Sequence, residues 1–203
     1  MLFRSVADFA IDAAANEVYL ADGYGNHRVI VFDADSGAYK RMWGAYGKLP
    51  SDEKFPSYNP DSPQFANPVH CVILAKNGLV YVCDRTNDRL QVFRKDGTFV
   101  REKVIAKDTF GSGSVWDVVF STDPQQRFLM INDGTNQLIY VLDRRTLEVV
   151  STFGGHGHMA GQFYGAHVMA GNSKGDLFIG ETYEGKRLQK FVYTGLGAPS
   201  TAP

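Results

Sequence analysis

The chain lacks several features that mark large classes of protein. Its 203 residues carry 21 basic and 22 acidic side chains, so the net charge of −1 offers none of the positive excess that nucleic-acid binding requires. The longest apolar runs, such as Cys71–Ala75, have five residues, whereas a membrane-spanning helix needs about 20. We therefore expect a globular protein with neither a nucleic-acid partner nor a membrane partner.

Cysteine is also scarce, and the N-terminus shows no targeting segment. Cys71 and Cys83 are the only two cysteines, and neither belongs to a CxxC motif or a Cys/His cluster. A disulfide framework and a thiolate zinc site are therefore not expected, and both residues are interpreted as small buried apolar side chains. The start MLFRSVADFA lacks the apolar stretch of a signal peptide. The protein would be periplasmic or secreted with an upstream signal peptide, and cytoplasmic without one.

What the sequence does contain is a repeat. In four segments a β-branched and aromatic run ends in an acidic residue, a polar turn follows, and a second alternating run begins: EVYLADGYGNHRVIVFD (17–33), LVYVCDRTNDRLQVFRKDG (79–97), FLMINDGTNQLIYVLDRRT (128–146) and LFIGETYEGKRLQKFVYTG (177–195). Alternation of period two around such turns predicts antiparallel hairpins. Because all four repeats have the acidic residue, we interpret this set as structural acceptors for turn amides: Asp22, Asp84, Asp133 and Glu181.

Each hairpin is flanked by further strand-like runs. An apolar run precedes every hairpin, and a more polar fourth run follows the first three. Four antiparallel strands in about 40 to 50 residues are typical of a β-propeller blade. The predicted fold is therefore all-β: a single propeller domain over 1–195, with blades at about 5–47, 66–106, 113–155 and 163–195. Residues 196–203 are predicted to be a disordered tail.

The number of blades leaves the closure of the ring open. The fourth repeat has only three clear strands, and open sheet edges are unfavourable. The four blades could close on themselves, or copies could associate as a homo-oligomer through open blade edges. Alternatively, the chain is the C-terminal part of a larger ring, which is the interpretation we favour.

The hairpins VYLADGYGNHRVIVFD and VYVCDRTNDRLQVFRKDGTFV resemble NHL repeats, over about residues 5–195. More narrowly, the succession DGYGNHR, NPVHCV, CDRTNDRLQVF and GQFYGAHV resembles the lyase domain of peptidylglycine α-amidating enzymes. It resembles still more closely bacterial secreted NHL proteins of unassigned activity. Members of both groups are six-bladed, so the resemblance implies about two further blades ahead of this start.

Two histidines occupy equivalent places in alternate repeats. His70 and His167 each stand at the start of an inner strand, after PQFANPV and GQFYGA, and the repeat between them has Trp116 or Asp117 there. Three imidazoles with a fourth position left open are how catalytic zinc is held. The resemblance implies such a three-histidine zinc and places two of its ligands on His70 and His167. The third ligand is absent from this chain.

The resemblance also implies catalytic roles for Tyr24 and Arg85. Tyr24, in the DGYGN turn, matches the family's base toward the substrate hydroxyl, and a phenol of pKa about 10 needs a metal or cation nearby to act near neutrality. Arg85 matches the arginine that holds the substrate carboxylate, which suits a permanently charged, bidentate guanidinium. The alternatives are that Tyr24 packs as a turn residue and that Arg85 pairs with Asp84 or Asp88.

One departure from the family counts against a calcium site. The family has an Asp directly after its last zinc histidine, whereas this chain has Val168, which offers no oxygen ligand to a hard cation. His156 and His158 have HxH spacing, but the glycines around them indicate an exposed turn.

We weigh three functions. The first is a metal-dependent, amidating-lyase-like propeller that cleaves the N–C bond of an α-hydroxyglycine-type substrate and releases an amide and glyoxylate. The second is a non-catalytic NHL scaffold that binds a protein, a peptide or a small molecule at the channel face. The third, less favoured, is a calcium-dependent lactonase-type propeller, which would need Glu, Asn and Asp to converge at the channel.

Overall fold

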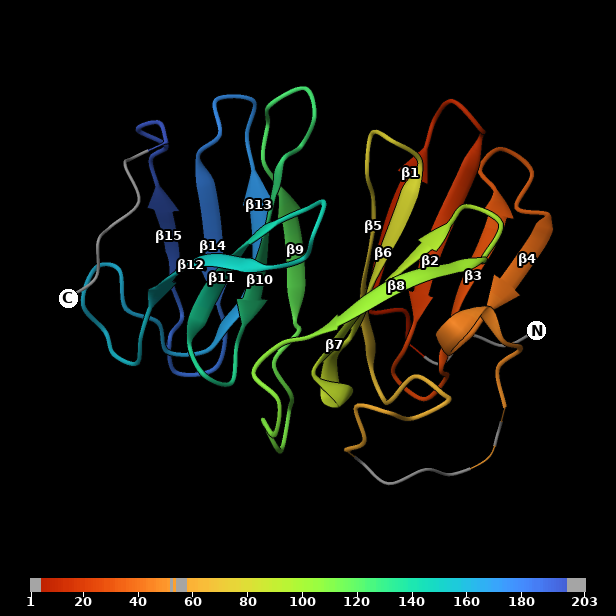
Figure 1. The fold of residues 1–203 in the computed structure, drawn as a ribbon, viewed down its shortest axis with the longest axis horizontal. Helices are drawn as coiled ribbons and strands as arrows, with labels where there is room; N and C mark the ends of the chain where they lie inside the picture. The colour runs from red at the N-terminus through yellow and green to blue at the C-terminus, as the bar shows by residue number, and fades with distance from the viewer. Residues whose placement is uncertain (1–4, 52, 54–57, 197–203) are drawn as a thin grey trace.

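The computed structural model of the chain describes residues 5–51, 53 and 58–196. Within these residues, fifteen strands form four antiparallel sheets, which are arranged as the blades of a β-propeller (Figure 1). The predicted all-β propeller of four visible blades is thus confirmed. Three blades have four strands and the last has three. The predicted disordered tail, 196–203, lies outside the described residues except for Leu196.

In each blade the strands pair in the order in which they follow one another along the chain. Blade 1 consists of β1 (Asp8–Asp12), β2 (Glu17–Asp22), β3 (Arg28–Asp33) and β4 (Tyr39–Trp43). Blade 2 consists of β5 (Val69–Leu74), β6 (Leu79–Asp84), β7 (Arg89–Arg94) and β8 (Phe99–Val104). Blade 3 consists of β9 (Asp117–Phe120), β10 (Phe128–Asp133), β11 (Leu138–Asp143) and β12 (Val149–Gly154). Blade 4 consists of β13 (Ala166–Gly171), β14 (Leu177–Glu181) and β15 (Leu188–Phe191). Two short 3-10 turns, η1 (Ala45–Gly47) and η2 (Arg85–Asn87), complete the described elements.

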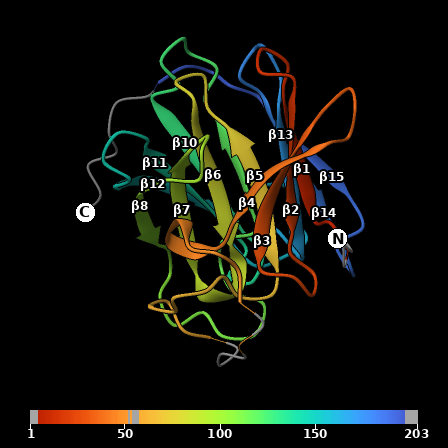
Figure 2. The same cartoon turned by 90° about the vertical axis from the view of Figure 1, so that its right-hand side faces the viewer.

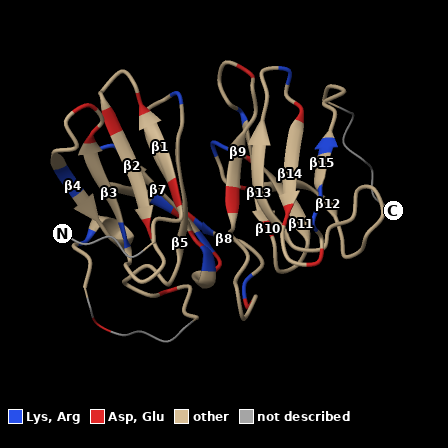
Figure 3. Cartoon of the chain, turned by 180° about the vertical axis from the view of Figure 1, so that it is seen from behind, with Lys and Arg blue, Asp and Glu red and all other residues tan. Residues whose placement is uncertain are grey.

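The inner strands pack in chain order, β1 against β5, β5 against β9 and β9 against β13. The outermost strand of blade 1, β4, lies at the edge of the molecule in Figure 1 and faces the viewer in Figure 2. Acidic and basic residues are interspersed over the blades in Figure 3. In the part of the chain that the structure describes, no helix has the length and apolar character needed to cross a bilayer.

The alternating pattern of the strands explains how the blades hold together. Successive side chains point to opposite faces of a sheet, so a blade between two others buries both sets. β6, for example, is buried from Val80 to Asp84. Three apolar clusters result, one between each pair of neighbouring blades. The cluster between blades 1 and 2 includes Trp43 and Phe93, and the one between blades 2 and 3 includes Tyr81 and Leu129. The cluster between blades 3 and 4 includes Phe163 and Ile179. Burying each such side chain stabilises the fold by about 1.5–3 kcal/mol.

Among the residues that the structure describes, the two end blades have apolar side chains on faces that no neighbouring blade covers. On β1, Ala10 packs into the core, whereas Phe9 and Ile11 point to the other face and are 62% and 60% exposed. On blade 4, Val168 and Leu188 are 50% and 68% exposed. The alternation that builds the core therefore also makes both end faces apolar.

The repeated acidic residue mainly binds an arginine. Asp84 lies 2.6 Å from Arg89, and both side chains are fully buried. The same pair occurs in blade 1 as Asp22–Arg28 and in blade 4 as Glu181–Arg187, at 2.7 and 2.6 Å. Blade 3 has Leu138 in the arginine position, directly opposite Asp133, and there Asp133 accepts the turn N–H groups of Thr135 and Asn136. The prediction that these residues accept turn amides is therefore right for Asp133, but it missed the arginines that neutralise the other buried carboxylates.

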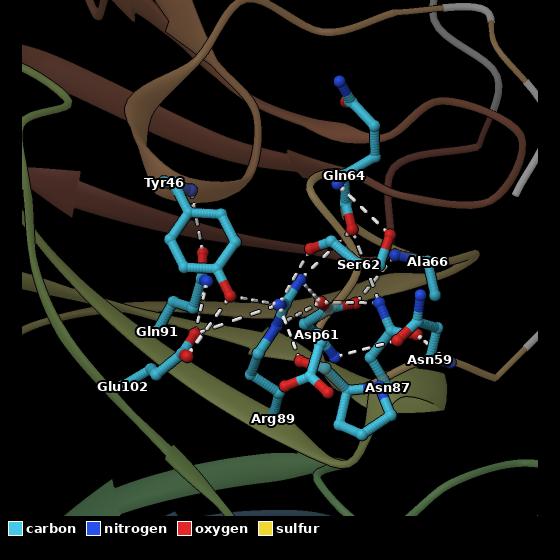
Figure 4. A network of polar contacts seen from close by, with 12 residues as sticks. Tyr46, Asn59, Asp61, Ser62, Gln64, Ala66, Asn87, Arg89, Gln91 and Glu102 are labelled. Atoms are coloured by element: carbon cyan, nitrogen blue, oxygen red, sulfur yellow. Dashed lines mark hydrogen bonds and ion pairs between the residues drawn. The ribbon is translucent and has the colours of Figure 1, made fainter.

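The pair in blade 2 also anchors the loop that leads to the inner strand. Arg89 donates to the Tyr46 hydroxyl and to the carbonyls of Pro60, Ser62 and Gln64, at 2.8–3.1 Å (Figure 4). Asp84 in turn accepts the Ala66 N–H at 2.8 Å. One buried guanidinium thus holds the described part of this loop, residues 58–67, against β7 just before β5 begins.

Cys71 and Cys83 form a disulfide, so the expectation of no disulfide is wrong. The two residues stand directly opposite each other on β5 and β6, with their Cα atoms 4.8 Å apart, which lies within the range of disulfides. Their separation along the chain hid this, because it is the hairpin between them that makes them cross-strand neighbours. The prediction that both are buried is confirmed, at 2% and 0% exposure.

Candidate functional site

Five side chains from the four blades gather near the inner strands, and we call them the site cluster: Tyr24, His70, Arg85, Trp116 and His167. The His70 ring centroid lies 5.9 Å from that of Tyr24, 5.8 Å from that of Trp116 and 5.1 Å from that of His167. The Arg85 guanidinium carbon lies 4.5 Å from the Trp116 ring and 5.9 Å from the Tyr24 ring. The structure therefore brings together all four site residues predicted from the sequence and adds Trp116.

Both histidines lie on β-bulges. On β5 the register passes from Val69 to Cys71 and leaves His70 unpaired, and on β13 it passes from Ala166 to Val168 and leaves His167 unpaired. In blades 1 and 3 the ladders of β1 and β9 begin one residue later, at Asp8 and Asp117. The residue before each, Ala7 or Trp116, donates its N–H to the carbonyl of the same partner residue, Ala21 or Asn132. A bulge inserts one residue and re-aims its side chain, and bulges are common beside active sites. An inserted residue in each of two alternate blades thus presents the two imidazoles to each other.

The hydrogen bond of His70 fixes its tautomer. His70 Nδ1 lies 2.6 Å from the main-chain oxygen of Trp116. A carbonyl can only accept, so Nδ1 carries the proton and Nε2 keeps a free lone pair. Burial lowers the pKa of His70 to about 4, with the charges of Arg85 and His167 adding to the effect. Partial burial and Arg85 also lower the pKa of His167. Both imidazoles are therefore neutral near pH 7, which is the state that binds metals.

The two imidazoles fit two positions of a zinc site. With Zn–N bonds of about 2.1 Å, two rings at a tetrahedral ion have centroids roughly 5 Å apart, and the observed separation is 5.1 Å. The carbonyl bound to His70 Nδ1 is the kind of outer partner that metal-bound histidines have. Among the described residues, however, no group of three His, Cys, Asp or Glu side chains could hold a metal ion. His70 and His167 thus match two of the three protein ligands that a catalytic zinc uses.

Arg85 is a cation without a carboxylate partner among the described residues. Its Nη1 donates to the Tyr24 hydroxyl at 3.3 Å, and its Nε is buried with no protein partner. Asp84 pairs instead with Arg89, and Asp88 accepts the backbone N–H groups of the loop that follows β8. The alternative that Arg85 is neutralised by Asp84 or Asp88 is therefore wrong. A half-buried guanidinium with unused donors is suited to binding a carboxylate.

Tyr24 lies at the exposed side of the cluster. Its side chain is 41% exposed, and its hydroxyl accepts the hydrogen bond from Arg85. This contact places the phenol directly beside the Arg85 guanidinium. Tyr24 also contacts the His70 ring edge-on, so it packs against the cluster while its hydroxyl meets solvent.

Two further inner-strand residues were missed from the sequence as a set. Asp8 accepts the Val72 N–H at 3.0 Å and Asp117 accepts the Met169 N–H at 2.7 Å, so each carboxylate joins its blade to the next. Burial raises the pKa of both carboxyl groups, that of Asp117 to about 7. Their shared register position, one place before the acidic end of the second strand, could have revealed them. Val168 has the same position in blade 4 and is 50% exposed.

The remaining histidines of the loop before β13 lie apart from these contacts. His156 and His158 are exposed, as predicted. His158 stacks on Tyr164 with ring centroids 4.6 Å apart. No metal role is indicated for this pair.

Comparisons with known proteins agree with this picture of the chain. No protein-family model matches it. It is 24% identical over 196 residues to the peptidyl-glycine alpha-amidating monooxygenase of Mus musculus, an alignment that covers 95% of this chain and 18% of that protein. Over 101 residues it is 32% identical to peptidyl-glycine alpha-amidating monooxygenase B of Xenopus laevis, covering 49% of this chain and 10% of that one. The chain thus spans less than a fifth of the length of these curated relatives.

Solved structures match the fold over most of the chain. The Kuenenia stuttgartiensis hydrazine synthase gives a TM-score of 0.64 at 13% identity, covering 92% of this chain and 46% of that one. The U3-55K structure gives 0.62 at 12% identity, covering 93% and 52%. At such identities the likeness concerns the fold alone. Over most of its length, therefore, the chain is a β-propeller with distant homology to the peptidylglycine alpha-amidating monooxygenases.

Proposed function

We propose that the propeller carries an amidating-lyase-like site, which cleaves the N–C bond of an α-hydroxyglycine-type substrate and releases an amide and glyoxylate. The observation that carries this proposal is the meeting of four matched residues in one cluster. Tyr24, His70 and His167 have neighbouring ring centroids 5.9 and 5.1 Å apart, and Arg85 donates to Tyr24. These residues come from three different blades, so their contact is a property of the fold and not of the local sequence.

The residues of this chain have separate tasks in the reaction. Arg85 binds the substrate carboxylate, because it is the unpaired guanidinium of the cluster. Tyr24 then takes the proton of the substrate hydroxyl; the C–O bond becomes the aldehyde of glyoxylate, the C–N bond breaks, and the amide nitrogen receives a proton. The hydrogen bond from Arg85 holds the Tyr24 hydroxyl beside the guanidinium that binds the carboxylate. A zinc ion held by His70 and His167, when bound, would act as a Lewis acid on a substrate oxygen.

A non-catalytic scaffold is the second candidate, and the ligand count favours it. The described residues supply two imidazoles and no third metal-binding side chain beside them. A propeller with the same cluster would then bind a carboxylate-bearing peptide or small molecule at Arg85 without cleaving it. The two candidates share the binding step and differ only in the bond cleavage.

The experiment measures binding and cleavage separately. Purified protein, with and without added Zn²⁺, is incubated with N-benzoyl-α-hydroxyglycine, and glyoxylate and benzamide are quantified. We expect equimolar products that are lost in Tyr24→Phe and retained in Tyr39→Phe, a similarly exposed tyrosine on β4. If the wild-type protein binds the compound through Arg85 but forms no glyoxylate at any zinc concentration, the scaffold is correct and the lyase is not.

A further inference from the structure

Trp116 contacts three of the other four members of the site cluster. Its main-chain oxygen accepts the His70 Nδ1 proton at 2.6 Å, and its indole ring lies edge-on to His167 with centroids 5.3 Å apart. The Arg85 guanidinium carbon stands 4.5 Å from the same ring. A guanidinium in this position is attracted by the negative face of the indole. Trp116, from blade 3, therefore contacts His70 and Arg85 of blade 2 and His167 of blade 4.

The indole itself is held firmly. Trp116 is 4% exposed, and its Nε1–H donates to the Gly113 carbonyl at 2.7 Å. Its N–H donates to the Asn132 carbonyl at 2.9 Å, which continues the pairing of blade 3. Gly134 lies against the indole, where an added Cβ would come within 2.7 Å of the ring. The ring thus has a fixed place before any ligand arrives.

The second glycine brings the Trp116 loop to Arg85. Gly113 has a φ of +73°, and a Cβ there would lie 1.9 Å from the Arg85 carbonyl oxygen. A side chain at this position would push the loop away from η2, which begins at Arg85. The Gly113 carbonyl also accepts the Trp116 indole N–H. The close approach of Gly113 to Arg85 therefore sets the distance between the Trp116 indole and the Arg85 guanidinium.

We propose that Trp116 is a positioning residue of this site: it holds the Arg85 guanidinium in place to receive a carboxylate and holds His167 in place beside His70. The nature of the carboxylate ligand rests on the proposed function above, whereas the contacts of Trp116 are independent of any reaction. Trp116 itself neither accepts nor donates a proton to the substrate.

The test compares two tryptophans that are equally buried. Trp43 is 2% exposed and packs between blades 1 and 2, away from the site cluster, so Trp43→Phe is the matched control for a lost indole. N-Benzoylglycine, which lacks the hydroxyl and cannot be cleaved, probes Arg85 by calorimetry. Zn²⁺ alone, in competition with a chelating dye, probes the histidines. Both affinities are measured for the wild type, Trp116→Ala, Trp116→Phe and Trp43→Phe, at temperatures where circular dichroism shows each variant folded.

We expect Trp116→Ala to bind both N-benzoylglycine and Zn²⁺ about tenfold more weakly than the wild type. Trp116→Phe, which keeps an aromatic face, restores most of both affinities, and Trp43→Phe leaves them unchanged. The inference is overturned if Trp116→Ala binds both probes like the wild type, if Trp43→Phe weakens them equally, or if the wild type binds neither. A wild type that binds both probes but makes no glyoxylate overturns the lyase and leaves the role of Trp116 intact.

Discussion

The imidazole rings of His70 and His167 lie 5.1 Å apart, centroid to centroid, although the two residues belong to blades separated by a third. Trp116 of the intervening blade contacts both rings. The bulges on β5 and β13 make this approach possible, because each adds one residue to an otherwise regular inner strand. The pair is thus a property of the arrangement of blades.

The first prediction concerns zinc. His70→Ala or His167→Ala is expected to weaken Zn²⁺ binding by more than about 100-fold, since the loss of an outer-shell partner alone costs 10–100-fold. Competition with a chelating dye measures the affinity, and metal analysis of protein purified without chelator gives the stoichiometry. His158→Ala is the control, because His158 is exposed and stacks on Tyr164. Equal zinc binding by all three variants would remove both histidines from the site.

A second prediction concerns the carboxylate. Hydrogen bonds to charged groups contribute about 1.5–3 kcal/mol, so Arg85→Gln is expected to bind N-benzoylglycine roughly 10- to 100-fold more weakly than the wild type. Arg85→Lys keeps the charge but loses the bidentate geometry and should lie between the two. Arg127→Gln, a 56% exposed arginine on blade 3, is the control. An unchanged affinity in Arg85→Gln would show that the carboxylate binds elsewhere.

A third prediction concerns the pH dependence of stability. Burial raises the pKa of Asp117 to about 7 in the folded protein, above its usual value of 3.8. Between these two values the folded state holds a proton that the unfolded state has lost, so this residue makes stability fall as pH rises from about 4 to 7. Asp117→Asn keeps an acceptor for the Met169 N–H but cannot titrate, so its free energy of unfolding should decrease less between pH 4 and pH 7 than that of the wild type. Urea unfolding from pH 4 to pH 8 measures the free energy of unfolding, with Asp35→Asn, at an exposed aspartate, as the control. If Asp117→Asn and the wild type show the same pH dependence, the raised pKa of Asp117 is contradicted.

The fourth prediction concerns the buried arginine of blade 2. Arg89→Met leaves the Asp84 carboxylate buried without its counter-charge, which typically costs about 3–5 kcal/mol. The loop over residues 58–67 also loses the hydrogen bonds to its carbonyls, so proteolysis within this loop should become faster. Chemical denaturation measures the first effect and limited digestion the second. Arg127→Met should change neither, and a loss below about 1 kcal/mol in Arg89→Met would contradict the buried pair.

The fifth prediction concerns the disulfide. Closing a short loop with a disulfide stabilises a protein by roughly 2–3 kcal/mol, so Cys71→Ala/Cys83→Ala should unfold at a correspondingly lower urea concentration. The unfolded wild type should show no free thiol toward a thiol reagent, and two after reduction. Two free thiols without reductant would contradict the cross-strand bond.

The sequence predicted the fold well because the signal for blades is local. Period-two alternation and polar turns specify hairpins, and four copies of one pattern specify the propeller. The clustering of Tyr24, Arg85, His70 and His167 followed from a resemblance, and the structure supplied the contacts that join them. Long-range partners were harder: the disulfide of Cys71 and the carbonyl of Trp116 opposite His70 depend on which residues face each other across strands and blades. Spacing along the chain does not report such contacts.

The bulges separate the choice of side chain from the pairing of the strands. His70 and His167 have no partner on the adjacent strand, whereas the residues on either side of each are paired. A substitution at either position would therefore exchange the imidazole for another side chain and leave the ladder around it unchanged.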